Sequence, residues 1–182
     1  MTRAVIFDRD GTLIKYIPYL YKTLDVEFYP GVLDACLKLK AHNILMFIAT
    51  NQSGIGRGYF LESDYLKLAD YIESVFRDYG CPIQKTLFSP YHPEFGIGKY
   101  KQKTQCRKPN PGMLNQIIAD YHLDPATVMM IGDSTVDIQA ADNAGIQSAL
   151  VRTGLGLESE KKIRPTFVAD SVADVVNSYI LI

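Results

Sequence analysis

The sequence has no tryptophan, few cysteines and almost no excess charge of either sign. Its 19 Lys and Arg residues nearly balance 20 Asp and Glu residues, so the net charge of −1 gives no overall positive field for binding nucleic acid. Three cysteines are too few for a disulfide framework, and their odd number favours reduced thiols in a cytoplasmic protein. Long apolar runs are missing too: none approaches the roughly 18–20 residues of a bilayer-spanning helix, and the start is charged too early for a secretory signal. We therefore expect no nucleic-acid partner and no membrane partner.

The composition is otherwise that of a folded globular protein. Hydrophobic residues make up 47% and charged residues 21% of the chain, which argues against disorder. A chain of 182 residues has the usual length for one hydrophobic core, so we expect residues 1–182 to form a single domain. We expect this domain to be a monomer.

Short apolar runs alternate along the chain with longer segments of helical period. The short runs predict strands at residues 4–7, 44–49, 85–89, 128–131, 146–151 and 166–169. Apolar residues every three to four positions predict helices at residues 30–43, 65–79, 111–121 and 136–144, with a last one starting at Ser171. Strands that alternate with helices predict an α/β fold: a doubly wound, Rossmann-like parallel sheet with helices on both faces.

Residues 90–110 fit neither pattern. Prolines and glycines interrupt this segment and predict that it has no regular element: Pro90, Pro93, Gly96, Gly98 and Pro109. A loop this long inside a compact domain is usually functional or disordered. Its lysines, Lys99, Lys101 and Lys103, form either a solvated surface or a basic rim that attracts an anion such as a second phosphate.

Polar side chains come directly after three of the predicted strands. Asp8 and Asp10 follow the first strand, Thr50 and Asn51 follow the second, and Asp133 follows the fourth. The Asp-x-Asp-Gly segment by itself is equally good turn chemistry. However, ligands of open parallel sheets bind beyond the carboxyl ends of the strands, so we expect these separated groups to converge at one edge of the sheet.

The converging carboxylates predict a Mg²⁺ site. Asp8, Asp10 and Asp133 would repel one another strongly unless a cation neutralised them, and Asp137 follows Asp133 by one helical turn. A hard cation such as Mg²⁺ fits, because the cluster has no His or Cys at ligand spacing.

The same groups predict phosphoryl transfer. Thr50 and Lys108 supply a hydroxyl and an ammonium that can hold the oxygens of a phosphoryl group. Asp8 is the expected nucleophile that attacks phosphorus. Asp10 is the expected acid, which protonates the leaving oxygen and later takes a proton from the water that hydrolyses the aspartyl-phosphate.

Four segments resemble the signatures of the haloacid dehalogenase (HAD) superfamily of phosphatases. They are residues 7–13 (FDRDGTL), 49–54 (ATNQSG), 106–112 (CRKPNPG) and 132–137 (GDSTVD). The second and third segments are most similar to the branch that contains D-glycero-D-manno-heptose 1,7-bisphosphate phosphatases and histidinol-phosphate phosphatases. The resemblance implies a HAD-like fold without a substantial cap domain, and a small-molecule phosphate ester as substrate.

The resemblance also implies roles for individual residues. The metal ligands would be Asp8, the backbone carbonyl of Asp10, and Asp133, while Arg107 would contribute to substrate recognition. The remaining expected substrate-binding residues lie in the second signature: Asn51, Gln52 and Ser53.

The sequence departs from this branch at two points. The branch commonly holds a structural zinc with Cys-x-His and Cys-x-Cys, whereas here only Cys106 keeps a ligand type in place and His92 is one position off. Two ligands are too few for a closed tetrahedral site, so we expect no structural zinc. Ser134 is often a lysine in the family, and its replacement removes a positive charge beside the expected metal.

Several interpretations remain open at this stage. The glycines of residues 54–58 form either an anion-binding nest or a flexible turn, and the tyrosines of residues 16–21 either line the substrate site or pack the fold. The preferred function is a Mg²⁺-dependent phosphatase of a heptose bisphosphate, with histidinol phosphate or another sugar or nucleotide phosphate as alternatives. A non-enzymatic receiver-type domain would keep the phosphate on aspartate instead, but Asp10 supplies the proton-transfer group that a receiver does not need.

Overall fold

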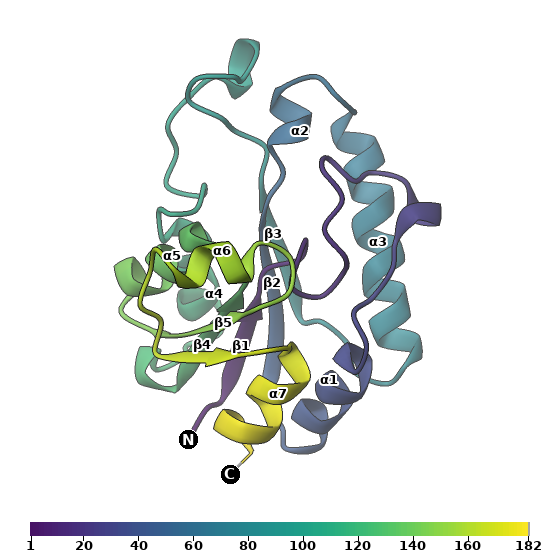
Figure 1. Ribbon diagram of the computed structural model, residues 1–182. Coiled ribbons are helices and arrows are strands. Elements are labelled where there is room, and N and C mark those ends of the chain that lie inside the picture. Colours follow the sequence, from purple (N-terminus) through teal and green to yellow (C-terminus); the bar gives the residue numbers. More distant parts are fainter. Residues whose placement is uncertain (182) are drawn as a thin grey trace.

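A six-stranded parallel sheet forms the centre of the protein in the computed structural model, which describes residues 1–181. The strand order is β3-β2-β1-β4-β5-β6 (Figure 1). The strands are β1 (Ala4–Phe7), β2 (Leu45–Asn51), β3 (Lys85–Ser89), β4 (Val128–Gly132), β5 (Gln147–Val151) and β6 (Phe167–Ala169). The helices are α1 (Val32–Ala41), α2 (Ser53–Gly56), α3 (Glu62–Asp78), α4 (Gly112–Asp120), α5 (Thr135–Ala144), α6 (Gly156–Glu160) and α7 (Val172–Val175), which continues as a π-helix over Val176–Ile180. The doubly wound parallel sheet is confirmed, and residues 1–181 contain no large inserted cap domain.

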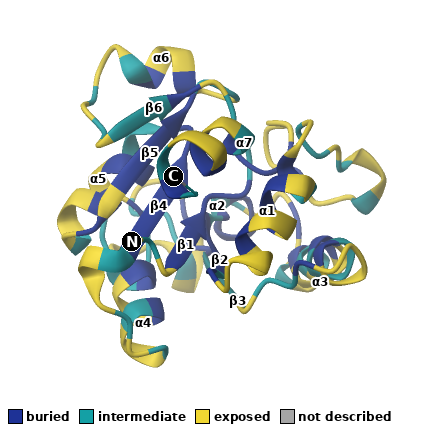
Figure 2. Ribbon diagram, turned by 90° about the horizontal axis from the view of Figure 1, so that it is seen from below, coloured by how far each residue is buried: buried dark blue, intermediate teal, exposed yellow. Residues whose placement is uncertain are grey.

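The two faces of the sheet are buried by different helices. Val5 and Phe7 of β1 point to a core that includes residues of α1, α3 and α7, whereas Ala4 and Ile6 point to a second core with α4 and α5. All four residues of β1 are 0% exposed, because helices cover both faces of this strand. Figure 2 shows this layering as a buried sheet between helices whose outer surfaces are exposed.

Strand register brings the separated motifs to one edge. Phe7, the last residue of β1, lies beside Ile48 of β2 and Ile131 of β4. Thr50 and Asp133 each lie two residues beyond these partners, and Asp8 lies one residue beyond Phe7. The carboxyl ends of the three central strands therefore present their polar residues in one place, as parallel pairing requires.

The structure corrects the predicted elements at four places. Strand β2 continues through Thr50 and Asn51, so these residues end the strand instead of following it. Helices α2 and α6 were not predicted, because each is only four or five residues long and carries no helical period. The expected irregular loop contains one 3₁₀ turn, Gly98–Tyr100, and the hydroxyl of Tyr100 donates to Glu62 Oε2 at 3.0 Å.

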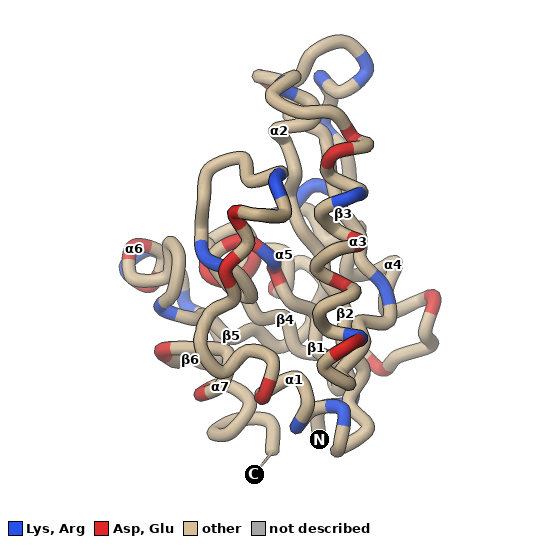
Figure 3. The backbone as a smooth tube through the Cα atoms, turned by 90° about the vertical axis from the view of Figure 1, so that its right-hand side faces the viewer, with Lys and Arg blue, Asp and Glu red and all other residues tan. Residues whose placement is uncertain are grey.

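Acidic and basic positions are interspersed along the backbone in the view of Figure 3. This matches the balanced composition. Within residues 1–181, no helix has both the length and the apolar character that crossing a bilayer demands.

Candidate active site

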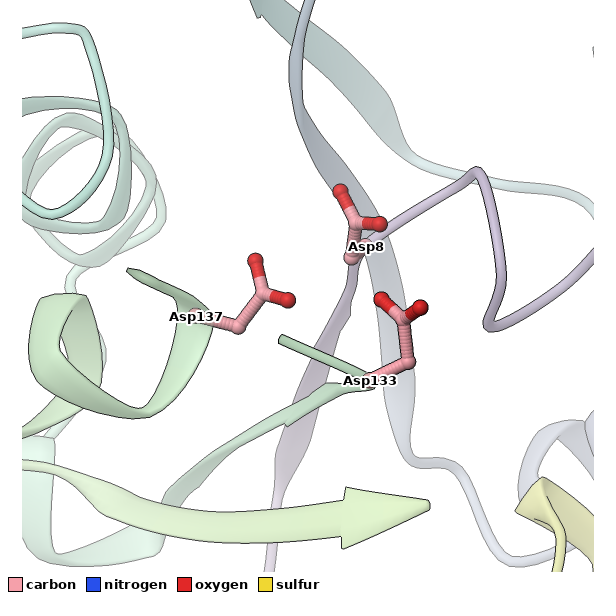
Figure 4. Close-up of side chains that lie close together, drawn as sticks. All are labelled: Asp8, Asp133 and Asp137. Atoms are coloured by element: carbon pink, nitrogen blue, oxygen red, sulfur yellow. The ribbon is translucent and has the colours of Figure 1, made fainter. Parts of the chain in front are cut away.

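Three buried carboxylates meet at the carboxyl edge of the sheet. Asp8 directly follows β1, Asp133 directly follows β4, and Asp137 lies in the first turn of α5. Each offers an oxygen within 4.8 Å of the others, and their side chains project into one space (Figure 4). Among residues 1–181 they are the only group of three or more His, Cys, Asp or Glu side chains so arranged.

The electrostatics of this group fit a divalent cation. Burial, together with the neighbouring carboxylates, raises the pKa of Asp8 to about 7 and the pKa of Asp133 to about 8. Without a metal ion the site therefore favours protonated carboxyls, since buried negative charges lack enough compensation. Oxygen ligands with excess negative charge are the donor set that Mg²⁺ prefers.

Lys108 is the one ammonium inside the carboxylate cluster, among the residues that the structure describes. Its Nζ lies 2.6 Å from Asp8 Oδ1, 2.6 Å from Asp137 Oδ1 and 2.6 Å from the carbonyl oxygen of Ala49. Burial lowers the pKa of Lys108, but the charges of Asp137 and Asp8 outweigh burial, so that its pKa is raised and it remains an ammonium. Lys108 donates hydrogen bonds to Asp8 Oδ1 and to the Ala49 carbonyl oxygen, and its contact with Asp137 is an ion pair.

Each carboxylate oxygen of Asp137 has a partner within the protein, and neither contact was predicted from the sequence. Its Oδ2 accepts hydrogen bonds from the Ser134 backbone N–H at 3.0 Å and from the Ser134 hydroxyl at 2.5 Å, in a capping box at the start of α5. Its Oδ1 faces Lys108. Asp137 therefore fixes the Lys108 ammonium to the end of a helix, and the Ser-x-x-Asp spacing was the signal available for the cap.

Close approach of two loops holds Asp133. A Cβ on Gly11 or on Gly154 would lie 2.1 Å from Asp133 Oδ2, and both glycines have positive φ. The backbone N–H of Leu155 donates to the same oxygen at 2.7 Å. Only glycine permits this packing, so the orientation of Asp133 depends on the loops that follow β1 and β5.

Most of the expected site residues surround one cavity of about 130 Å³. Its lining includes Asp8, Asp10, Thr50, Asn51, Lys108 and Asp133. A neighbouring groove is lined by Asp10, Asn51, Gln52 and Ser53, and Tyr16 lines both spaces. Tyr19 and Tyr21 pack against Tyr59 and Phe60, so residues 16–21 both line the site and pack the fold.

Two expected substrate-binding residues also make bonds within the protein. The side-chain amide of Asn51 pairs with the backbone of Lys108, as acceptor at 3.1 Å and donor at 3.0 Å. The Arg107 guanidinium, half-buried, donates from Nη1 to the carbonyl oxygen of Tyr91 at 3.0 Å and lines neither the cavity nor the groove. Burial and the nearby Arg57 lower the pKa of Arg107.

Contacts in the long loop and in α2 bear on three expectations from the sequence: the zinc ligands, the lysine rim and the glycine segment. Cys106 Sγ lies 3.1 Å from the Thr104 hydroxyl, and His92 Nδ1 accepts from the backbone N–H groups of Glu94 and Phe95. The lysines at 99, 101 and 103 are exposed, and the glycines at 54 and 56 lie buried within α2.

Comparison with known proteins agrees with this geometry. A family model described as HAD-hydrolase-like matches residues 105–175. The D-glycero-beta-D-manno-heptose-1,7-bisphosphate 7-phosphatase of Haemophilus ducreyi is 40% identical over 176 residues, which is 96% of each chain. The D-glycero-alpha-D-manno-heptose-1,7-bisphosphate 7-phosphatase of Burkholderia mallei is 40% identical over 149 residues, covering 82% of this chain and 79% of that one.

A solved structure agrees over the same extent. The D,D-heptose 1,7-bisphosphate phosphatase from B. bronchiseptica, in complex with magnesium and phosphate, superposes with a TM-score of 0.85 at 31% identity and covers 97% of each chain. Sequence, fold and the carboxylate cluster thus point to the same relatives. The chain belongs to the heptose-1,7-bisphosphate phosphatase family of HAD-like hydrolases.

Proposed function

We propose that this protein is a Mg²⁺-dependent phosphatase that removes the 7-phosphate of D-glycero-D-manno-heptose 1,7-bisphosphate. The observation that carries the proposal is the buried cluster of Asp8, Asp133 and Lys108 in a chain that is 40% identical to such phosphatases over nearly its whole length. The substrate is a small phosphate ester, in keeping with the size of the cavity.

Asp8, Asp133 and the backbone carbonyl of Asp10 would hold the metal ion. When bound, Mg²⁺ neutralises the carboxylate repulsion and the charge that develops on the phosphoryl oxygens. The Asp8 carboxylate attacks phosphorus and forms an aspartyl-phosphate, while Asp10 gives its proton to the departing sugar oxygen. Asp10 then takes a proton from water, which attacks the aspartyl-phosphate, releases phosphate and restores Asp8.

Thr50 and Lys108 would bind the phosphoryl oxygens. Thr50 Oγ1 accepts a hydrogen bond from Gln52, so its own hydrogen is free to donate to the substrate. When Asp8 becomes the aspartyl-phosphate, it loses its negative charge. The Lys108 hydrogen that donated to Asp8 Oδ1 can then donate to a phosphoryl oxygen. Substrate recognition by Asn51, Gln52, Ser53 and Arg107 is part of the same proposal.

The proposal extends to the setting in which the enzyme works. Cys36, Cys81 and Cys106 are free thiols, which supports a reducing compartment and hence the cytoplasm. We infer a monomer in which residues 1–182 form one domain; one sheet connecting the elements of residues 1–181 supports the single domain.

The substrate is tested by a panel of phosphate esters compared by kcat/KM. The alpha and beta anomers of heptose 1,7-bisphosphate are expected to exceed histidinol phosphate, hexose phosphates and nucleoside monophosphates by about 10-fold or more. A better substrate among the alternatives would overturn the heptose assignment. Stoichiometric labelling without repeated phosphate release would instead indicate a receiver.

Magnesium binding is expected to strengthen as the pH rises. Because the pKa values of Asp8 and Asp133 are raised to about 7 and about 8, both carboxyls hold protons under mildly acidic conditions, and the metal must displace them. The metal-free native state binds more protons than the unfolded state in this range, so its stability falls as the pH rises from about 4 to about 8. Thermal-shift titrations should show the apparent Kd for Mg²⁺ tightening about 10-fold or more between about pH 6 and about pH 8. A Kd that does not change with pH would contradict this assignment of the ligands.

A further inference from the structure

The carboxyl group of Asp10 is held from inside the protein by Arg9 and Gln52. Arg9 Nε donates to Asp10 Oδ2 at 3.1 Å, and Arg9 Nη2 donates to Oδ1 at 3.0 Å. Gln52 Nε2 donates to Asp10 Oδ2 at 2.8 Å and to Thr50 Oγ1 at 3.0 Å. The two hydrogens of one amide therefore connect the expected acid with the expected phosphoryl-binding hydroxyl.

Burial of the Arg9 charge carries a desolvation cost that its partners must offset. Its side chain is 2% exposed and lies over the ring of Tyr65, with Cζ 5.5 Å from the ring centroid. Among residues 1–181, its Nη1 has no hydrogen-bond partner, and the carboxylate that pairs with Arg9 is Asp10. A buried ion pair often contributes no more stability than apolar residues of similar volume. A turn after β1 does not require such a pair, so its consequence is the fixed orientation of Asp10.

We propose that Arg9 and Gln52 are positioning residues that aim the Asp10 carboxyl at the leaving oxygen, an inference that rests on the function proposed above. Oδ2 of Asp10 is occupied by both Gln52 and Arg9 Nε, whereas Oδ1 receives one bond, from Arg9 Nη2. Oδ1 is therefore the oxygen with room for the sugar oxygen, to which the acid passes its proton as the phosphorus–oxygen bond breaks. This transfer leaves Asp10 as a carboxylate and the sugar as an alcohol.

The leaving group distinguishes misplacement of Asp10 from general damage to the site. An alkyl phosphate needs a proton on its departing oxygen, whereas p-nitrophenyl phosphate releases a stable anion. The value of kcat/KM reports the steps up to the departure of this group. A misplaced Asp10 should therefore lower kcat/KM more for the sugar phosphate than for the aryl phosphate.

The test uses Gln52→Met, which keeps side-chain length, and Arg9→Met, which keeps the apolar stem of the longer arginine; both remove the donors. For each variant kcat/KM for heptose bisphosphate is expected to fall about 10- to 100-fold, within the range that a general acid contributes. For each variant the fall for the aryl phosphate should be at least about threefold smaller, because any effect on phosphate binding through Thr50 is shared by both substrates. Arg9→Lys, which keeps a charge and one donor, should recover part of the loss.

Arg152→Met is the matched control. The Arg152 guanidinium donates two similar hydrogen bonds to Glu160, at 2.8 and 2.9 Å, away from the cavity. Its replacement should leave kcat/KM unchanged for both substrates. An equal fall for both substrates in the Gln52 and Arg9 variants would overturn the positioning role. If Arg9→Met does not fold, Gln52→Met decides alone. Failure of the wild type to hydrolyse either ester would refute the proposed function instead.

Discussion

Asp8→Asn is expected to abolish turnover, by about 10⁴-fold or more, because the amide cannot attack phosphorus. The same change should leave the fold intact. Burial raises the pKa of Asp8 to about 7, which means that its ionised form destabilises the metal-free protein. At about pH 8 the metal-free variant should therefore unfold at the same temperature as the wild type or a higher one.

The measurements are single-turnover and steady-state phosphate release, paired with thermal unfolding without and with Mg²⁺. Asp34→Asn, which removes an exposed carboxylate outside the cavity, serves as the control and should keep full activity. Substantial residual turnover by Asp8→Asn would show that another group is the nucleophile. A large loss of metal-free stability would show that Asp8 is needed for folding.

Lys108→Met should damage both stability and activity. The ammonium is 1% exposed and pairs with Asp8 and Asp137 at 2.6 Å, so its removal leaves buried carboxylates uncompensated. At about pH 8 the free energy of unfolding should fall by about 3–5 kcal/mol, and kcat should fall about 10²-fold or more. Under mildly acidic conditions the loss of stability should be smaller, because the carboxyls can take up protons.

The raised pKa of Lys108 determines in which pH range its own titration affects the stability of the wild type. Its own titration removes stability only above its usual pKa, so between acidic and neutral pH the change in the ion pair comes from Asp8, whose pKa is raised to about 7. The double variant Lys108→Met, Asp137→Asn removes one unpaired carboxylate and should recover stability in urea unfolding without recovering activity. A double variant that is no more stable than Lys108→Met would contradict the ion-pair explanation.

Motif spacing predicted most of the cavity lining, but not the contacts that hold it. Asp8, Asp10 and Asp133 were identified because each follows an apolar strand, and polar groups beyond parallel strands share an edge. Arg9 was passed over because a lone arginine in a turn carries no pattern. Its burial, and its pairing with Asp10, depend on α3, which supplies Tyr65.

The alternation of short apolar runs with helical segments was sufficient to determine the parallel sheet, because burial on both faces leaves a continuous apolar strand. Chain order and strand chirality then bring the residues after β1, β2 and β4 to one edge. Only the tertiary structure decided which charges pair there: Lys108 lies 100 residues from Asp8 in the chain, and the capping box of α5 directs Asp137 toward it. Local periodicity records which side chains are buried, whereas the pairing of buried charges depends on distances between elements that no local pattern contains.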